Sequence, residues 1–105
     1  HWAALGCTGW AYDDVLPFFR KAEANERGAD AWHGADGPLF VSDQTCANQA
    51  SRDFVESAAA LQLRRNDDFN GENQDGFGLY QVTQRRGERW SAARAYVEPM
   101  KGSAN

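Results

Sequence analysis

The sequence predicts an α+β fold, in which helices and short strands follow one another in a single small unit. Two segments, 13–23 and 51–62, carry apolar residues at helical spacing. Two others, 39–42 and 77–84, are short apolar runs preceded by stretches rich in glycine and acidic residues, which is typical of strands. With 105 residues, the chain is long enough for one small domain.

The first helix lies within residues 9–23 and has one apolar face. The residues of this face follow the spacing i, i+3, i+4 and i+7: Val15, Phe18, Phe19 and Ala22. Asp14 is a suitable N-cap, because its carboxylate can accept hydrogen bonds from the amides of the first turn. Pro17 then occupies the third helical position, where its missing N–H has no partner in any case. If Asp13 is the cap instead, the helix loses only its first hydrogen bond.

The middle of the chain is predicted to hold one strand and one helix between loops. Residues 25–38 are rich in glycine and aspartate and form a loop that leads into the strand 39–42. The second helix, 51–62, has Asn48 or Ser51 as its cap. Its apolar positions at i, i+4 and i+7 are Phe54, Ala58 and Leu61.

The C-terminal third is predicted to form a hairpin followed by a short helix. The strand 77–84 leads into a turn in which Gly87 supplies a positive φ, and residues 89–91 form the return strand. Ser91 caps a last helix, which Pro99 closes.

The charge balance argues against a nucleic-acid partner. The net charge is −4, and the arginines at 85, 86, 89 and 94 are interspersed with acids. We interpret these arginines as a solvated hairpin tip. No apolar run approaches the roughly 18 residues of a membrane span, and no secretory signal is visible. We therefore expect a cytoplasmic protein, with peripheral attachment of the parent protein to the inner membrane left open.

The segment 66–71, "NDDFNG", partly matches a calcium-binding loop. Asn66, Asp68 and Asn70 occupy its first, third and fifth positions. The twelfth position is Phe77, which cannot replace the bidentate glutamate of such loops. We therefore expect an Asn-Gly turn stabilised by Asx hydrogen bonds, and no bound calcium.

No catalytic, cofactor-binding or metal-binding residue is predicted within the chain. His33 and His1 have no carboxylate or nucleophile at the spacing of a catalytic pair, so His33 is expected to be a loop histidine that bonds to the backbone. Cys7 and Cys46 are expected to be free thiols, and they form no compact zinc motif with His33. The glycine-rich stretches lack both the dinucleotide fingerprint and a P-loop lysine.

Four blocks, in order and spacing, resemble the glucose–methanol–choline (GMC) oxidoreductases, above all the bacterial members similar to choline and alcohol dehydrogenases. They are "GWAYDDVLPFFRKAE", "WHGADGPLFVSD", "DFNGENQDGFGLYQVT" and "GERWSAARAYVEP". The resemblance covers essentially residues 1–105. Two departures are Cys7, where family members often carry Asn, and Trp90, where choline-type members often carry a small residue. The second favours a broader alcohol-dehydrogenase type.

The resemblance implies an FAD-dependent enzyme that oxidises a small alcohol by passing hydride to the flavin N5, with an active-site histidine taking the hydroxyl proton. It also implies that the flavin fingerprint precedes His1 and that the catalytic histidine follows Asn105. Residues 1–105 are then one partial domain: a fragment of the substrate-side antiparallel sheet, with flanking helices, of a two-domain FAD oxidoreductase. In this interpretation the isolated chain binds no FAD and is inert, and its partner is the rest of the same polypeptide.

The alternative is a free-standing, non-catalytic binding or interaction domain. The fragment interpretation makes a structural prediction that separates the two. Large apolar side chains should lie on one continuous exposed face, next to the first helix and the chain ends. The candidates are Trp2, Trp10, Phe18, Phe19, Phe40 and Tyr96.

Overall fold

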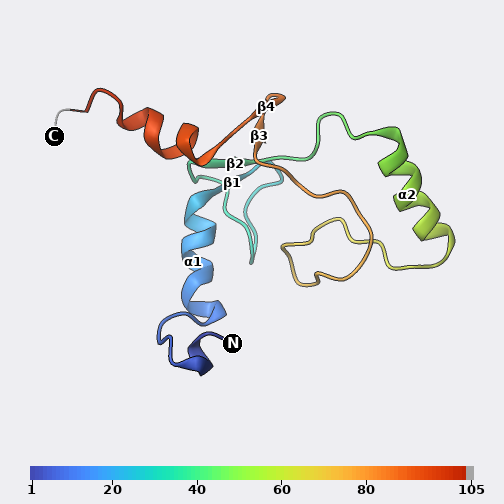
Figure 1. The fold of residues 1–105 in the computed structure, drawn as a ribbon, viewed down its shortest axis with the longest axis horizontal. Coiled ribbons are helices and arrows are strands. Elements are labelled where there is room, and N and C mark those ends of the chain that lie inside the picture. The colour runs from blue at the N-terminus through green and yellow to red at the C-terminus, as the bar shows by residue number, and fades with distance from the viewer. Residues whose placement is uncertain (104–105) are drawn as a thin grey trace.

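A computed structural model describes residues 1–103 and shows a spread-out arrangement (Figure 1). Two small sheets lie at its centre, and helices extend away from them in different directions. The radius of gyration is 17.0 Å, whereas a closely packed domain of this length has about 13 Å. The described residues therefore do not form a ball around a core of their own.

Helix α1, Tyr12–Ala22, begins earlier than predicted. Its N-cap is Ala11, and Asp14 is the third helical residue, from which its carboxylate reaches back to accept the Ala11 N–H at 3.0 Å. Asp14 is thus not the N-cap, because an acid at the third position satisfies the first amide equally well. Pro17 consequently lies inside the helix and removes one bond to the carbonyl of Asp13.

Strands β1 (Glu23–Asn25) and β2 (Leu39–Val41) form a parallel pair. The predicted strand at 39–42 is confirmed, but its neighbour is the segment directly after α1, and the pairing is not antiparallel. The connection between them runs close to α1, since a Cβ on Gly34 would lie 1.7 Å from the carbonyl oxygen of Arg20. Only glycine permits this approach.

Helix α2, Gln49–Ala60, has Asn48 as its N-cap. The Asn48 carboxamide oxygen accepts the Ala50 N–H at 2.9 Å, so the first of the two predicted caps is confirmed. Short 3₁₀ turns, η1 (Ala3–Leu5) and η3 (Glu98–Met100), lie near the two ends of the described chain.

The predicted strand 77–84 is wrong as a continuous strand. Phe77 pairs only with Arg65, and Val82 only with Ser42. The physical reason is visible at Gly78, where an added Cβ would lie 1.7 Å from the Asn66 carbonyl oxygen. The backbone at this point packs against another loop, which leaves no room for a regular ladder.

The hairpin turn is confirmed, although the hairpin is short. Strands β3 (Gln84–Arg85) and β4 (Glu88–Arg89) pair antiparallel. Arg86 and Gly87 between them have φ values of 52° and 80°, as a type I′ turn requires.

The last helical segment, η2 (Ala93–Val97), is wound as a π-helix. Its N-cap is Ala92 and not the predicted Ser91, although the Ser91 hydroxyl accepts the Arg94 N–H at 3.2 Å. Pro99 does not close this helix but lies in the following turn η3, whose first residues need no N–H donor.

The described residues bury very little apolar surface. The buried hydrophobic residues are three alanines: Ala24, Ala58 and Ala95. Exposed large side chains are Trp2, Leu5, Trp10, Tyr12, Phe18, Phe19, Phe54, Leu61, Leu63, Tyr80, Tyr96, Val97 and Met100. Five of the six predicted exposed residues are among them, and Phe40 is half-buried. The exposure also reaches α2, so it is not confined to one face beside α1 and the chain ends.

Within residues 1–103, no helix combines the length and the apolar character that a membrane crossing requires.

Candidate functional site

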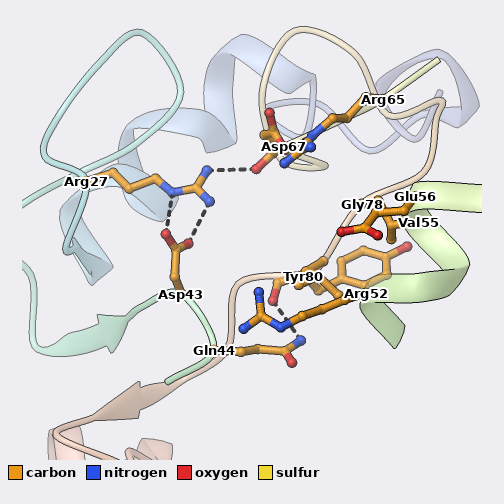
Figure 2. Close-up of a pocket in the computed structure, with 11 residues that line it drawn as sticks. Arg27, Asp43, Gln44, Arg52, Val55, Glu56, Arg65, Asp67, Gly78 and Tyr80 are labelled. Carbon is orange, nitrogen blue, oxygen red and sulfur yellow. Dashed lines mark hydrogen bonds and ion pairs between the residues drawn. The ribbon is translucent and has the colours of Figure 1, made fainter. Parts of the chain in front are cut away.

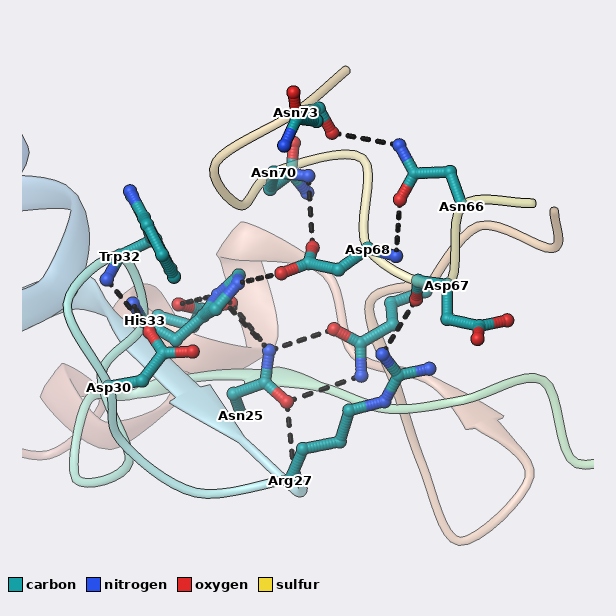
Figure 3. A network of polar contacts seen from close by, with 12 residues as sticks. Asn25, Arg27, Asp30, Trp32, His33, Asn66, Asp67, Asp68, Asn70 and Asn73 are labelled. Carbon is teal, nitrogen blue, oxygen red and sulfur yellow. Dashed lines mark hydrogen bonds and ion pairs between the residues drawn. The ribbon is translucent and has the colours of Figure 1, made fainter. Parts of the chain in front are cut away.

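His33 is buried, with 6% of its surface exposed, in the loop between β1 and β2. The Asp30 carboxylate shapes this loop by accepting the N–H groups of Trp32 and His33, each at 2.7 Å (Figure 3). These two amide hydrogen bonds lower the pKa of Asp30 against the opposing effect of burial. The Arg20 guanidinium of α1 donates to the His33 carbonyl at 3.4 Å. The backbone of His33 is therefore held at both its N–H and its carbonyl group.

Both ring nitrogens of His33 contact carboxylates. Nδ1 lies 3.0 Å from Glu23 Oε2, and Nε2 lies 2.9 Å from Asp68 Oδ2. Burial alone would lower the pKa of His33, but the hydrogen bonds and negative charges of Asp68 and Glu23 raise it above its ordinary value. The prediction of a loop histidine that bonds only to the backbone is wrong. Its partners lie 10 and 35 residues away, on segments that only the fold brings together.

Asn25 of β1 connects this histidine to a more distant segment. Its amide nitrogen donates to Glu23 Oε1 at 3.0 Å and to Gln81 Oε1 at 2.8 Å. Its oxygen accepts the Arg27 N–H at 3.0 Å. Asn25 is 5% exposed, so these bonds replace the water that its buried amide has lost.

The segment 66–71 has the predicted Asx hydrogen bonds. Asn66 Oδ1 accepts the Asp68 N–H at 2.8 Å, and Asp68 Oδ1 accepts the Asn70 N–H at 3.0 Å. The oxygens that would ligate calcium therefore already serve the backbone. Among the described residues, no group of three His, Cys, Asp or Glu side chains has a metal-binding arrangement. The absence of calcium binding stays a prediction.

A polar pocket of about 290 Å³ lies between Arg27 and α2 (Figure 2). Arg27 forms a two-bond ion pair with Asp43, at 2.6 and 3.2 Å, and donates to the Asp67 carbonyl at 2.7 Å. The hydrogen bond to Asp43 raises the pKa of Arg27 against desolvation. Because each of the three guanidinium nitrogens already has a protein partner, Arg27 mainly joins the loops that carry Asp43 and Asp67.

Trp90 lies between two guanidinium groups. Arg85 and Arg94 are 5.1 and 5.0 Å from its ring centre, and its indole N–H donates to the Pro38 carbonyl at 2.9 Å. The interpretation as a solvated hairpin tip holds for Arg85, Arg86 and Arg89, which are exposed on the hairpin, although Arg85 also makes a cation–π contact with the ring. It is wrong for Arg94, which lies in η2 and is only partly exposed. Through its indole N–H, Trp90 joins the hairpin to the loop before β2.

A more apolar pocket of about 430 Å³ lies beside His33. Its walls come from α1 and β2, with Trp32 and Asn70 at the loops. No hydroxyl or thiol hydrogen-bonds the histidine among the described residues. Cys7 and Cys46 are both free, as predicted, and exposed. The cluster around His33 brings together an imidazole and two carboxylates, which can hold a charge and join loops.

The described residues thus combine mixed helices and strands, few buried apolar side chains, and loops joined by polar side chains. A sequence model of the GMC oxidoreductases matches residues 1–105. The chain therefore belongs to the GMC oxidoreductase family, as the four sequence blocks predicted.

Relatives and a solved structure support the same assignment. The chain is 47% identical over 98 residues to an oxygen-dependent choline dehydrogenase of Sinorhizobium fredii and 43% identical over 99 residues to one of Brucella ovis. These matches cover 93% and 94% of the chain, but 18% of each relative. The crystal structure of pyridoxine 4-oxidase from Mesorbium loti matches 92% of the chain and 19% of its own, with a TM-score of 0.80 and 30% identity.

The chain thus spans about a fifth of the length of the proteins it matches. The solved neighbour supports the mixed fold of this segment. The finer expectation of a substrate-side antiparallel sheet is not supported by the pairing of the described strands, since β1 and β2 are parallel and β3 and β4 are two residues each.

Proposed function

We propose that residues 1–105 are a segment of an FAD-dependent oxidoreductase that oxidises the CH–OH group of a small alcohol of the choline or alkanol type. The observation that carries this proposal is the match to choline dehydrogenases along nearly the whole chain, at 43–47% identity. At this level of identity the residues of the segment serve the same fold and, by extension, the same class of reaction. Hydride transfer to the flavin is the chemistry that the cofactor supplies.

The described residues do not fit a flavin of their own. Dinucleotides bind where a glycine-rich turn joins a strand to the N-terminus of a helix. Helix α1 follows η1 and a loop, and α2 follows Asn48, so neither begins at such a turn. We therefore assign FAD binding to other parts of the polypeptide and expect the isolated chain to be inactive.

The role of this segment is structural in our proposal. Its exposed aromatic residues pack against the rest of the same polypeptide, which is its main partner, and the substrate is a small molecule bound elsewhere or at their boundary. A cytoplasmic location belongs to the same proposal. A free-standing binding domain is the alternative, but a unit whose buried hydrophobic residues are three alanines has little to hold it together.

Anaerobic reduction of the flavin tests this function. The full polypeptide that carries residues 1–105 is mixed with choline, or with a series of primary alkanols, in the absence of oxygen. We expect at least one of these alcohols to bleach the visible absorbance band of the oxidised flavin. A polypeptide that contains no flavin, or whose flavin stays oxidised with every alcohol, contradicts the proposal. Reduction by alkanols but not by choline supports the broader substrate class suggested by Trp90.

A further inference from the structure

His33 joins two segments that are far apart in the sequence. Its Nδ1 contacts Glu23 of β1, and its Nε2 contacts Asp68 in the segment 66–71 (Figure 3). Both carboxylates also accept backbone amides, Glu23 Oε2 from Gly34 at 3.1 Å and Asp68 Oδ1 from Asn70 at 3.0 Å. Both are therefore used as acceptors, which is the role of the ionised form.

The two carboxylate contacts favour a proton on each ring nitrogen, although the amide nitrogen of Asn25 also lies 3.3 Å from Nδ1. A neutral imidazole has one N–H, and its other nitrogen presents a lone pair. Because Nδ1 and Nε2 lie 3.0 and 2.9 Å from carboxylate oxygens, a neutral ring would place a lone pair directly against a negative charge. Only the imidazolium donates to Glu23 and Asp68 at the same time.

We propose that His33 is a proton-dependent clamp, which in its doubly protonated form fastens the segment 66–71 to β1 and releases that segment when it loses a proton. The clamp spans 35 residues of chain between its ring and Asp68. It controls one wall of the apolar pocket beside α1, because His33 and Asn70 both line that pocket.

The other charges around the ring set the direction of the pH dependence. Asp30 accepts the His33 N–H from within the same loop, and Arg20 of α1 donates to its carbonyl. The net effect of the carboxylates is a raised pKa for His33. A group whose pKa is raised in the folded state contributes stability at low pH, and this contribution is lost as pH rises through the raised value. The segment is therefore fastened at lower pH and released at higher pH.

Release is local because a second tie remains. Arg27 donates to the Asp67 carbonyl at 2.7 Å, and arginine keeps its charge throughout the pH range in which histidine titrates. The end of the segment near Asp67 thus stays attached while the part that includes Asp68 and Asn70 is freed. The expected change is a partial opening of the pocket wall, with the rest of the fold unchanged.

Amide hydrogen exchange of the full polypeptide tests this clamp, at about pH 6 and about pH 9, on either side of the range in which histidine titrates. Rates are corrected for the intrinsic effect of pH, and peptides from α2 serve as the internal reference. Protection of residues 67–71 should fall about tenfold at the higher pH, since one hydrogen bond to a charged group changes an equilibrium by roughly that factor. Protection of α2 should stay constant.

Two neighbouring aspartates provide matched variants. Asp68→Asn keeps the size of the side chain and the oxygen that Asn70 uses, but it removes the charge that holds the ring. Its exchange at 67–71 should be fast and independent of pH. Asp67→Asn removes a more exposed charge that pairs with Arg65, and it should keep the pH dependence of the parent protein.

Three results overturn the clamp: a parent protein without pH dependence at 67–71, an Asp68→Asn variant that retains it, or an Asp67→Asn variant that loses it. If Asp68→Asn fails to fold, α2 loses its protection as well. In that case the clamp is tested by the pH dependence of exchange at 67–71 in the parent protein and in the Asp67→Asn variant. The experiment requires no enzymatic activity, so its outcome is independent of the proposed reaction.

Discussion

Individual glycines determine how closely the loops of this chain approach one another. Gly34 lies against the backbone of Arg20, and Gly78 lies against the backbone of Asn66. In both cases the nearest atom is a backbone carbonyl oxygen, which cannot move away as the end of a flexible side chain can. The first contact places the loop that carries His33 against the end of α1, and the second places the segment 66–71 against the backbone at Gly78.

Replacement of Gly78 by alanine should therefore destabilise the protein. The new methyl group would lie 1.7 Å from the Asn66 carbonyl oxygen, and such overpacking costs about 1–3 kcal/mol. The measurement is the denaturant midpoint of the full polypeptide. Gly87→Ala is the control, because the nearest atom there is 3.9 Å away, so this variant reports only the cost of a positive φ, about 1–2 kcal/mol. Equal midpoints for Gly78→Ala and the parent protein would show that the two loops are not in contact.

Hydrogen bonds of single residues were predictable from the sequence only where both partners are close together in the chain. The Asx hydrogen bonds of Asn66 and Asp68 were predictable, because their partners are two residues away. The partners of His33 and Trp90 were not, because they lie on segments whose approach depends on the whole fold. An isolated histidine or tryptophan in a glycine-rich loop carries no signal of which distant residue it will meet.

At the scale of elements, local chemistry predicted both long helices. The apolar spacing of both helices and the Asn48 cap of α2 are local features, so the sequence reveals them directly. The predicted Asp14 cap of α1 was wrong, because Asp14 lies at the third helical position. The parallel pairing of β1 with β2 was not predictable. Glu23–Asn25 has neither β-branched nor aromatic residues, and its strand exists only because β2 lies beside it. The predicted strand at 77–84 failed for the opposite reason, since its residues favour a strand but its neighbours do not permit one.

The Asn48 cap offers a test of how α2 begins. Asn48→Ala removes the acceptor of the Ala50 N–H and should destabilise the helix by about 1 kcal/mol. Asn48→Asp keeps an acceptor and should restore the lost stability, with a further contribution from its charge at the helix N-terminus. Hydrogen exchange of the first turn of α2 in the full polypeptide measures both. If Asn48→Ala exchanges no faster than the parent protein, the helix is held by its packing and not by this cap.

Residues 1–103 bury few apolar side chains of their own. Large aromatic residues are exposed on α1, on α2, on η2 and in the loops, and the radius of gyration exceeds that of a packed domain. Exposed polar contacts, such as the ion pair of Arg27 with Asp43, join loops but add little net stability. In our proposal, most of the free energy that orders this segment comes from its contacts with the rest of the polypeptide.

The isolated chain should consequently melt without a sharp transition. We expect a broad, weakly cooperative change in circular dichroism and strong binding of a hydrophobic dye, because the aromatic side chains have no apolar partners. Phe18→Asp should leave the melting of the isolated chain unchanged, whereas the same substitution in the full polypeptide should destabilise it. A cooperative transition above about 60 °C from a monomer would show that residues 1–105 are a complete domain.

The central claim is that this chain is the structural segment of a flavoenzyme whose cofactor is bound elsewhere in the polypeptide. The most direct measurement is a flavin fluorescence titration of the isolated chain, performed beside a flavin content assay of the full polypeptide. We expect the full polypeptide to retain FAD after purification and the isolated chain to show no binding at micromolar concentrations. Stoichiometric micromolar binding of FAD by residues 1–105, or a full polypeptide without flavin, would contradict the claim.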